Sequence, residues 1–133
     1  MHRGFNHPTP PEVLGAMQKF AALGVRVEIT EMDVPLDLGP DKRMPLRPAD
    51  IERQGTIYRQ MTATCLRVRA CTGMTFWGVD DNDRYQSLIK RNRGAMTMFG
   101  YGGEPKPAYT GAVRALSVAP GPRDRLSPGK PAG

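Results

Sequence analysis

Two carboxylates directly follow a stretch with the pattern of a β-strand. From Val25 to Thr30, apolar residues alternate with polar ones, which is the period expected of a strand with one buried face. Glu31 and Asp33 come next. Carboxylates held at such a position can do nucleophilic or acid–base chemistry. Strand ends are also where chains reach water, so from spacing alone solvated acids remain the first interpretation.

The alternative interpretation is a strand of a β/α barrel, whose active site is built at the carboxyl ends of the strands. In a regular strand, Glu31 would share a face with Val25, Val27 and Ile29. A carboxylate on such a face is costly to bury without partners or a purpose. A bulge at Thr30 would reverse that parity, and the sequence leaves both possibilities open.

The elements that must position these acids alternate along the chain. The pattern predicts helices over 10–24, 49–68 and from about 107, and strands over 25–30 and 74–77. Thr9 and Glu12 have the spacing of a capping box at the first helix. The residues expected on buried helix faces are Val13, Met17, Phe20 and Ala21, then Ile51, Ile57, Tyr58, Met61 and Cys65. The segments between, including 35–48 and 80–94, are predicted as loops.

This order predicts an α/β fold with parallel strands covered by helices. Because two strands do not form a stable parallel sheet alone, the chain is expected to associate or to be part of something larger. Residues 1–117 are expected to form the folded domain. Residues 118–133, rich in Pro and Gly, are expected to be a disordered tail.

Composition excludes several classes of protein. The 133 residues contain no apolar run long enough for a membrane span, and "MHRGFNHPTP" lacks the apolar centre of a signal peptide. The net charge of +6 is scattered, without an aromatic-interleaved basic stripe, so no nucleic-acid partner is expected. A small basic nucleic-acid binder would rest on charge alone. Asp81 and Asp83 lack the spacing of a calcium loop, and we expect no metal and no cofactor.

Several segments together resemble one enzyme family. "VEITEMDV" is similar to the strand-seven signature of family 10 glycoside hydrolases, the retaining endo-β-1,4-xylanases. "MTFWGVDDNDRY" resembles their strand eight, "KPAY" the start of their last helix, and the initial "MH" the end of strand six. The resemblance runs from Met1 to about Leu116. It implies that the chain is the C-terminal portion, strands six to eight, of a TIM (β/α)8 barrel.

The resemblance implies roles for individual residues. Glu31 falls on the catalytic nucleophile, and His2 and Asp33 on the two residues that hydrogen-bond around it. Trp77 falls on the tryptophan beneath the sugar next to the cleaved bond, and Tyr85 could cover the sugar where a tryptophan is usual. Taken without the resemblance, His2 reads as a disordered terminal residue and Trp77 as core packing.

Two cysteines lack the number and spacing of a metal site. From the residues alone, Cys65 and Cys71 are either two small buried hydrophobes or a disulfide across a short turn. The resemblance implies a disulfide between the seventh helix and the eighth strand. Three positions depart from the family pattern, which puts fine substrate preference in question: Asp80, Arg84 with Tyr85, and Gly100.

The largest departure is an absent motif. The family's acid/base glutamate lies in an Asn-Glu pair on strand four, and this chain has no Asn-Glu pair. The expected parent function is retaining endo-hydrolysis of β-1,4-xylan, with xylan or a xylo-oligosaccharide as partner and an extracellular location. The N-terminal half of the barrel is expected to be missing, and the isolated chain to be inactive. The alternative is a non-catalytic carbohydrate-binding remnant that uses Trp77 and Tyr85 as stacking platforms.

Overall fold

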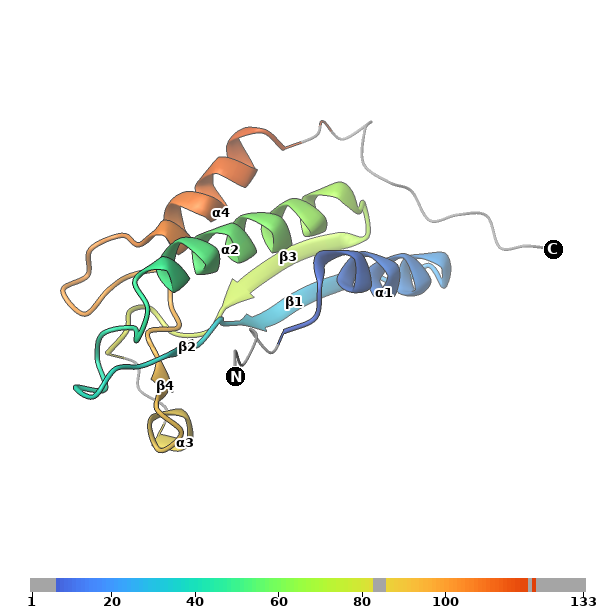
Figure 1. Ribbon diagram of the computed structural model, residues 1–133. Helices are drawn as coiled ribbons and strands as arrows, with labels where there is room; N and C mark the ends of the chain where they lie inside the picture. The colour runs from blue at the N-terminus through green and yellow to red at the C-terminus, as the bar shows by residue number, and fades with distance from the viewer. Residues whose placement is uncertain (1–6, 83–85, 120, 122–133) are drawn as a thin grey trace.

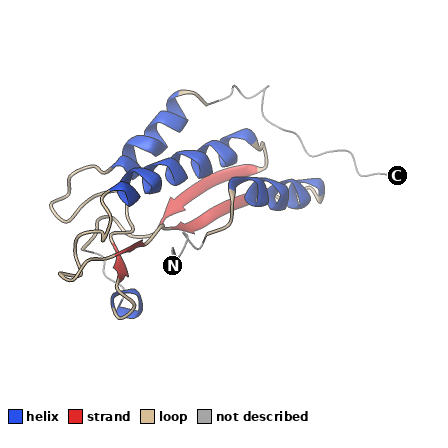
Figure 2. Cartoon of the chain, viewed as in Figure 1, coloured by secondary structure: helices blue, strands red, loops and turns tan. Residues whose placement is uncertain are grey.

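The computed structural model describes residues 7–82, 86–119 and 121 (Figure 1). Three longer helices and two paired six-residue strands form its main body, joined by loops and shorter elements (Figure 2). The elements in chain order are α1 (Pro10–Ala22), β1 (Val27–Met32), β2 (Leu36–Asp37), α2 (Ala49–Arg67), β3 (Cys71–Phe76), α3 (Gln86–Ile89), β4 (Arg93–Gly94) and α4 (Pro107–Ser117).

The strands β1 and β3 are parallel neighbours, as the alternation of elements predicts. Ile29 lies opposite Met74, and Met32 lies opposite Phe76. The pairing continues past the strand ends, because the backbone N–H of Trp77 donates to the carbonyl of Met32 at 3.0 Å. The carboxyl ends of both strands therefore meet at one end of the sheet.

The structure decides between the two parities of Glu31 that the sequence leaves open. The register between β1 and β3 shifts between Ile29 and Met32, so Met32, and not Glu31, joins the helix-facing side with Ile29. Met32 is 8% exposed and packs in the core, whereas Glu31 is exposed. An irregularity of this kind inserts a residue and reverses the alternation. The chain thereby turns Glu31 away from the core without burying its charge.

The helix α2 is the centre of the packing. Its buried residues recur at helical spacing and include Gln54, Ile57, Tyr58, Met61 and Cys65. Ile57, Tyr58 and Met61 form one core cluster with Met32 and Val34, whereas Cys65 belongs to a second cluster around Met17 and Cys71. The helix α4 lies along α2 on the side away from β1 (Figure 1). Gly55 permits this close approach, since a Cβ on it would lie 2.6 Å from the carbonyl oxygen of Pro107.

Two sequence expectations fail at the periphery. Phe20 is 53% exposed, because α1 packs through Met17 and Ala21 while Phe20 lines an open groove beside β1. The segments predicted as loops contain β2 and β4, which pair antiparallel, and the single turn of α3. Elements this short have no periodicity from which a sequence pattern could identify them.

Candidate active site

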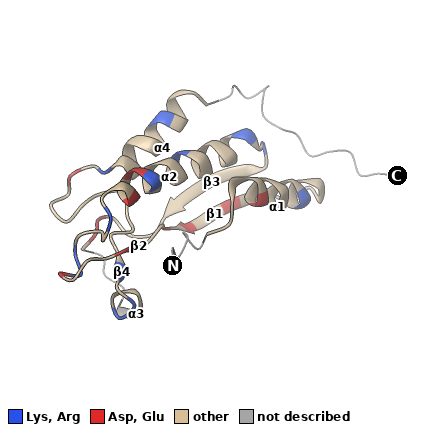
Figure 3. Cartoon of the chain, viewed as in Figure 1, with Lys and Arg blue, Asp and Glu red and all other residues tan. Residues whose placement is uncertain are grey.

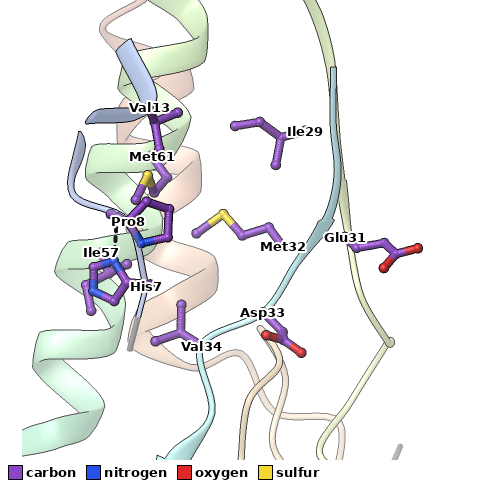
Figure 4. A pocket seen from close by; sticks show the side chains of 10 residues that line it. All are labelled: His7, Pro8, Val13, Ile29, Glu31, Met32, Asp33, Val34, Ile57 and Met61. Atoms are coloured by element: carbon purple, nitrogen blue, oxygen red, sulfur yellow. Dashed lines mark hydrogen bonds between the residues drawn. The ribbon is translucent and has the colours of Figure 1, made fainter. Parts of the chain in front are cut away.

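Glu31 is the penultimate residue of β1, and Asp33 follows the end of that strand. Glu31 is exposed and Asp33 is half-buried. Figure 4 shows the carboxylate of Glu31 on the side of the strand opposite to Ile29 and Met32. The end of β1 therefore carries one exposed carboxylate, Glu31, and one half-buried carboxylate, Asp33.

Burial raises the pKa of the Asp33 carboxyl, and the negative charge of Glu31 raises it further, while Arg93 opposes the shift. The two acids therefore sense each other electrostatically. Burial of a carboxyl group is one of the means by which active sites change its proton affinity. The acidic end of β1 is visible beside the labels of the two strands in Figure 3.

An apolar cavity of about 210 Å³ lies next to this strand end. It is bounded by His7, Ile29, Met32, Ile57 and Met61, so it occupies the helix side of β1 (Figure 4). The Glu31 carboxylate points away from this side. The cavity is a gap in the packing between α1, α2 and β1. Glu31 and Asp33 also contribute to its lining, although the carboxylate of Glu31 is directed to the opposite side of the strand.

Trp77 is placed at the same end of the sheet as Glu31 by its backbone bond to Met32. Trp77 is partly buried. The other two predicted site residues, His2 and Tyr85, lie outside the described residues, as does the third strand end expected at Met1. The structure therefore brings together Glu31, Asp33 and Trp77.

Lys106 and Asp81 form a buried ion pair next to the loop that follows Trp77. The ammonium of Lys106 donates to Asp81 Oδ2 at 2.8 Å and to the carbonyl of Ala95 at 2.8 Å. Asp81 Oδ1 accepts from the backbone N–H of Thr97 at 3.0 Å. Asp81 is 4% exposed and Lys106 is 9% exposed. Burial lowers the pKa of Lys106, and its bond to Asp81 opposes this shift.

The loop after β1 is tied to the same segment. The Gln54 amide donates to the carbonyls of Val34 and Ala95, each at 2.7 Å. The Tyr58 hydroxyl donates to the carbonyl of Met96 at 2.6 Å, and burial raises the pKa of Tyr58 above its usual range. The Gln54 amide nitrogen and the Tyr58 hydroxyl are therefore buried and bonded, whereas Gln54 Oε1 is buried without a hydrogen-bond partner among the described residues.

Arg93 on β4 holds the outer part of the loop after β1. Its guanidinium donates to the carbonyl of Pro35 at 2.7 Å and lies 3.4 Å from a carboxylate oxygen of Asp37. Sequence reasoning did not find Arg93, Lys106, Gln54 or Tyr58 as residues that support the site. The one available signal was Gln54, which lies three and four residues before Ile57 and Tyr58 on the face of the helix that is expected to be buried, since a glutamine is rarely buried without partners.

Cys65 and Cys71 form a disulfide between the last turn of α2 and the first residue of β3. The bond lies at the amino end of the sheet, opposite to Glu31. None of the helices in the described ranges combines the length and hydropathy required to cross a bilayer. Within the same ranges, no group of three potential metal ligands comes together.

Comparisons with known proteins agree with this geometry. An endo-1,4-beta-xylanase of Agaricus bisporus is 34% identical over 110 residues, which cover 81% of this chain and 31% of the relative. A glycosylated endo-beta-1,4-xylanase of family 10 from Gloeophyllum trabeum matches with a TM-score of 0.70 and 28% identity, over 84% of this chain and 33% of that structure. A family 10 xylanase from Bispora, solved with xylobiose, matches with a TM-score of 0.69 and 27% identity, over 82% and 33%.

The chain spans about a third or less of the length of the curated relatives it matches. Its α/β fold matches a portion of the barrel of the family 10 xylanases. The model of one family, described as glycosyl hydrolase family 10, matches residues 1–115. The family match extends from the first residue to within two residues of the end of α4 and includes Glu31, Asp33 and Trp77. This chain belongs to glycosyl hydrolase family 10.

Proposed function

We propose that this chain carries the nucleophile side of a retaining endo-1,4-β-xylanase, with Glu31 as the nucleophile. The observation that carries the proposal is the strand end itself. Glu31 is exposed at the carboxyl end of β1, and Asp33 lies half-buried two residues later. Trp77 follows the carboxyl end of the parallel strand β3. The substrate would be xylan or a xylo-oligosaccharide, the class of ligand bound in the Bispora structure.

In this mechanism, an oxygen of the Glu31 carboxylate attacks the anomeric carbon while the glycosidic bond breaks. Asp33 keeps a polar, charged environment around the nucleophile, and His2 is proposed to donate to Glu31. Trp77 would offer an aromatic face to the sugar next to the cleaved bond, and Tyr85 would cover it. None of these roles requires a metal or a cofactor.

A retaining enzyme also needs an acid that protonates the departing oxygen, about 5–5.5 Å from the nucleophile. Asp81 does not fit this role, because it is 4% exposed and already bound by Lys106 and Thr97. The sequence contains no Asn-Glu pair of the kind on which the family places this acid. We therefore assign β1 and β3 to the seventh and eighth strands of the barrel and the acid to the strand-four segment. Residues 1–117, which end with α4, form the catalytic part.

An extracellular location follows from the same proposal. A disulfide such as that between Cys65 and Cys71 forms and persists in oxidising compartments. Curated relatives include fungal xylanases, which is consistent with enzymes that act on polymers outside the cell.

The test must detect the nucleophile with a substrate that does not need the general acid. An aryl 2-fluoroxylobioside with a dinitrophenolate leaving group needs no protonation, because the phenolate departs with the bonding electron pair. Incubation with the chain should esterify Glu31, and peptide mass spectrometry should find the fluoroxylobiosyl group on that residue. Glu31→Gln should remain unlabelled, whereas Glu28→Gln, which alters another exposed acid of β1, should be labelled like the wild type.

Failure to label Glu31 would reject the assignment of the nucleophile. Saturable binding of xylobiose without any label would favour the alternative function, a carbohydrate-binding remnant that uses Trp77. That binding is measurable by fluorescence, since Trp77 is the chain's single tryptophan.

A further inference from the structure

The side chain of Arg93 lies beside the segment that follows β1. In the antiparallel pairing of β2 with β4, Arg93 is opposite Asp37. Its guanidinium nevertheless donates to the carbonyl of Pro35 at 2.7 Å, and its Nε lies 3.4 Å from a carboxylate oxygen of Asp37. The side chain therefore runs back along the segment toward β1. Its positive charge lies alongside residues 35–37, which begin two residues after Asp33.

Backbone hydrogen bonds hold the segment on both sides of this contact. The backbone N–H of Val34 donates to the carbonyl of Met96 at 3.3 Å, and that of Leu38 donates to the carbonyl of Asn92 at 2.7 Å. The side chain of Arg93 is 26% exposed, so solvent screens its charge only in part. The fold thus fixes a partly shielded positive charge close to the acidic end of β1.

Asp33 needs such a charge if it is to remain ionised. Burial raises the pKa of its carboxyl, Arg93 lowers it, and Glu31 raises it further. Two more ionisable groups in the described ranges are near Asp33: Tyr58 on α2, and His7, which lines the same cavity. Tyr58 stays neutral, because burial raises its pKa above the usual range. Arg93 therefore supplies the charge on β4 that opposes the uptake of a proton by Asp33.

The charge of Asp33 matters for the reaction at Glu31. The transition state of glycoside hydrolysis is oxocarbenium-like, so positive charge develops on the sugar while the nucleophile attacks. A second negative charge next to Glu31 stabilises that positive charge, whereas a protonated Asp33 does not. The reaction should therefore slow at the acidic pH where Asp33 takes up its proton.

We propose that Arg93 is a positioning residue that keeps Asp33 charged beside Glu31, and that it thereby sets the acidic limit of the reaction without touching the sugar. The inference rests on the proposed function, because it concerns the charge next to that nucleophile. It assigns a role to an arginine 60 positions away from Asp33 in the sequence. Asp37 shares the guanidinium, so it weakens the effect of Arg93 on Asp33.

The test uses two substitutions with opposite expected effects. Arg93→Met keeps an apolar stem and removes the positive charge, whereas Asp37→Asn removes the competing carboxylate. The rate at which the fluoroxylobioside labels Glu31 is measured over a series of pH values. The acidic limb of this profile should move to higher pH in Arg93→Met and to lower pH in Asp37→Asn.

The size of the effect depends on the pH. At the pH where the wild type is labelled at half its maximal rate, Arg93→Met should be labelled on the order of fivefold more slowly, as for removal of an opposite charge close to an ionising carboxyl. The plateau rate near neutral pH and the inactivation constant KI should stay unchanged, because Asp33 is ionised there and Arg93 does not contact the sugar.

Matched variants separate the charge of Arg93 from its structural contacts. Arg91→Met removes the same charge from an exposed position two residues away, and its profile should follow the wild type. Arg93→Lys keeps the charge and should restore most of the acidic limb. Asp37→Asn leaves the bond from Arg93 to Pro35 in place, so it tests the sign of the effect even if Arg93→Met is too unstable to measure.

A titration of Asp33 provides a readout that needs no label. With carbon-13 at the aspartate carboxyl groups, the Asp33 signal is identified by its loss in Asp33→Asn. Its midpoint should rise in Arg93→Met and fall in Asp37→Asn. An unchanged midpoint in both variants, or a shift of the limb in the same direction in both, would overturn the proposal. If wild-type Glu31 takes no label, the proposed function fails, and the titration still decides whether Arg93 keeps Asp33 charged.

Discussion

At the scale of single residues, Asp33 is an acid whose surroundings disfavour its charged form. Burial raises the pKa of Asp33 above 3.8, so the folded chain retains this proton to a higher pH than the unfolded chain does. The contribution of Asp33 to stability therefore falls as the pH rises through the window between 3.8 and the raised value. We expect Asp33→Asn to gain stability relative to the wild type across that window. Urea denaturation at a series of pH values would measure the difference.

Asp41 supplies a control of opposite sign. Backbone N–H groups of Arg43 and Met44 lower its pKa below 3.8, so its contribution is present above that value and is lost as the pH falls. Asp41→Asn should therefore lose stability relative to the wild type as the pH rises. Parallel pH profiles for Asp33→Asn and the wild type would contradict the environment described for Asp33.

At the scale of elements, the contact between α2 and α4 depends on glycine. A methyl group at Gly55 would lie 2.6 Å from the carbonyl oxygen of Pro107, and one at Gly111 would collide with the carbonyl of Gly55. Gly55→Ala should separate the helices and cost about 1–3 kcal/mol. Gly15→Ala on α1 meets nothing within 4 Å and should instead stabilise by about 0.5–1 kcal/mol. Thermal and urea unfolding of both variants would measure these values, and equal effects would show that the helices adjust freely.

The elements also show how far sequence reasoning reaches. The helix expected over 49–68 ends one residue earlier, and the interaction between Thr9 and Glu12 was readable because its partners are three residues apart. The placement of Glu31 and Trp77 at the same end of the sheet followed from the prediction of parallel strands. The parity of Glu31 did not, because the irregularity in β1 is fixed by its pairing with β3, far along the chain.

The buried polar network behind the site could not be found from the sequence for the same reason. Lys106 and Asp81 are 25 positions apart, and Gln54 and Ala95 are 41 apart. Lys106, Asp81 and Ala95 by themselves looked like ordinary surface positions. Only the fold brings them into one buried network, so a periodicity argument has no access to it.

At the scale of the whole molecule, the disulfide is a local support. Cys65 and Cys71 are six positions apart, and closing so short a loop contributes at most about 2–3 kcal/mol on the chain-entropy model. We expect reduction to lower the urea midpoint while the chain stays folded in buffer. A variant with both cysteines replaced by alanine should reproduce the reduced protein. Loss of the far-ultraviolet circular dichroism of the helices on reduction alone would show that the bond is a foundation of the fold.

The central place of α2 has a consequence for how the molecule opens. Gln54 and Tyr58 are fully buried, and α1, α4 and β3 all pack against this helix. The amides between Gln54 and Met61 should thus be the last to exchange with deuterium, because their exposure requires global opening. The pairing of β2 with β4 holds only two residues on each side, so its amides should exchange early. The pair β2–β4, which follows the carboxyl end of β1, would then open locally while α2 stays closed, so the segment after Glu31 and Asp33 could adapt to a sugar at little cost to the fold.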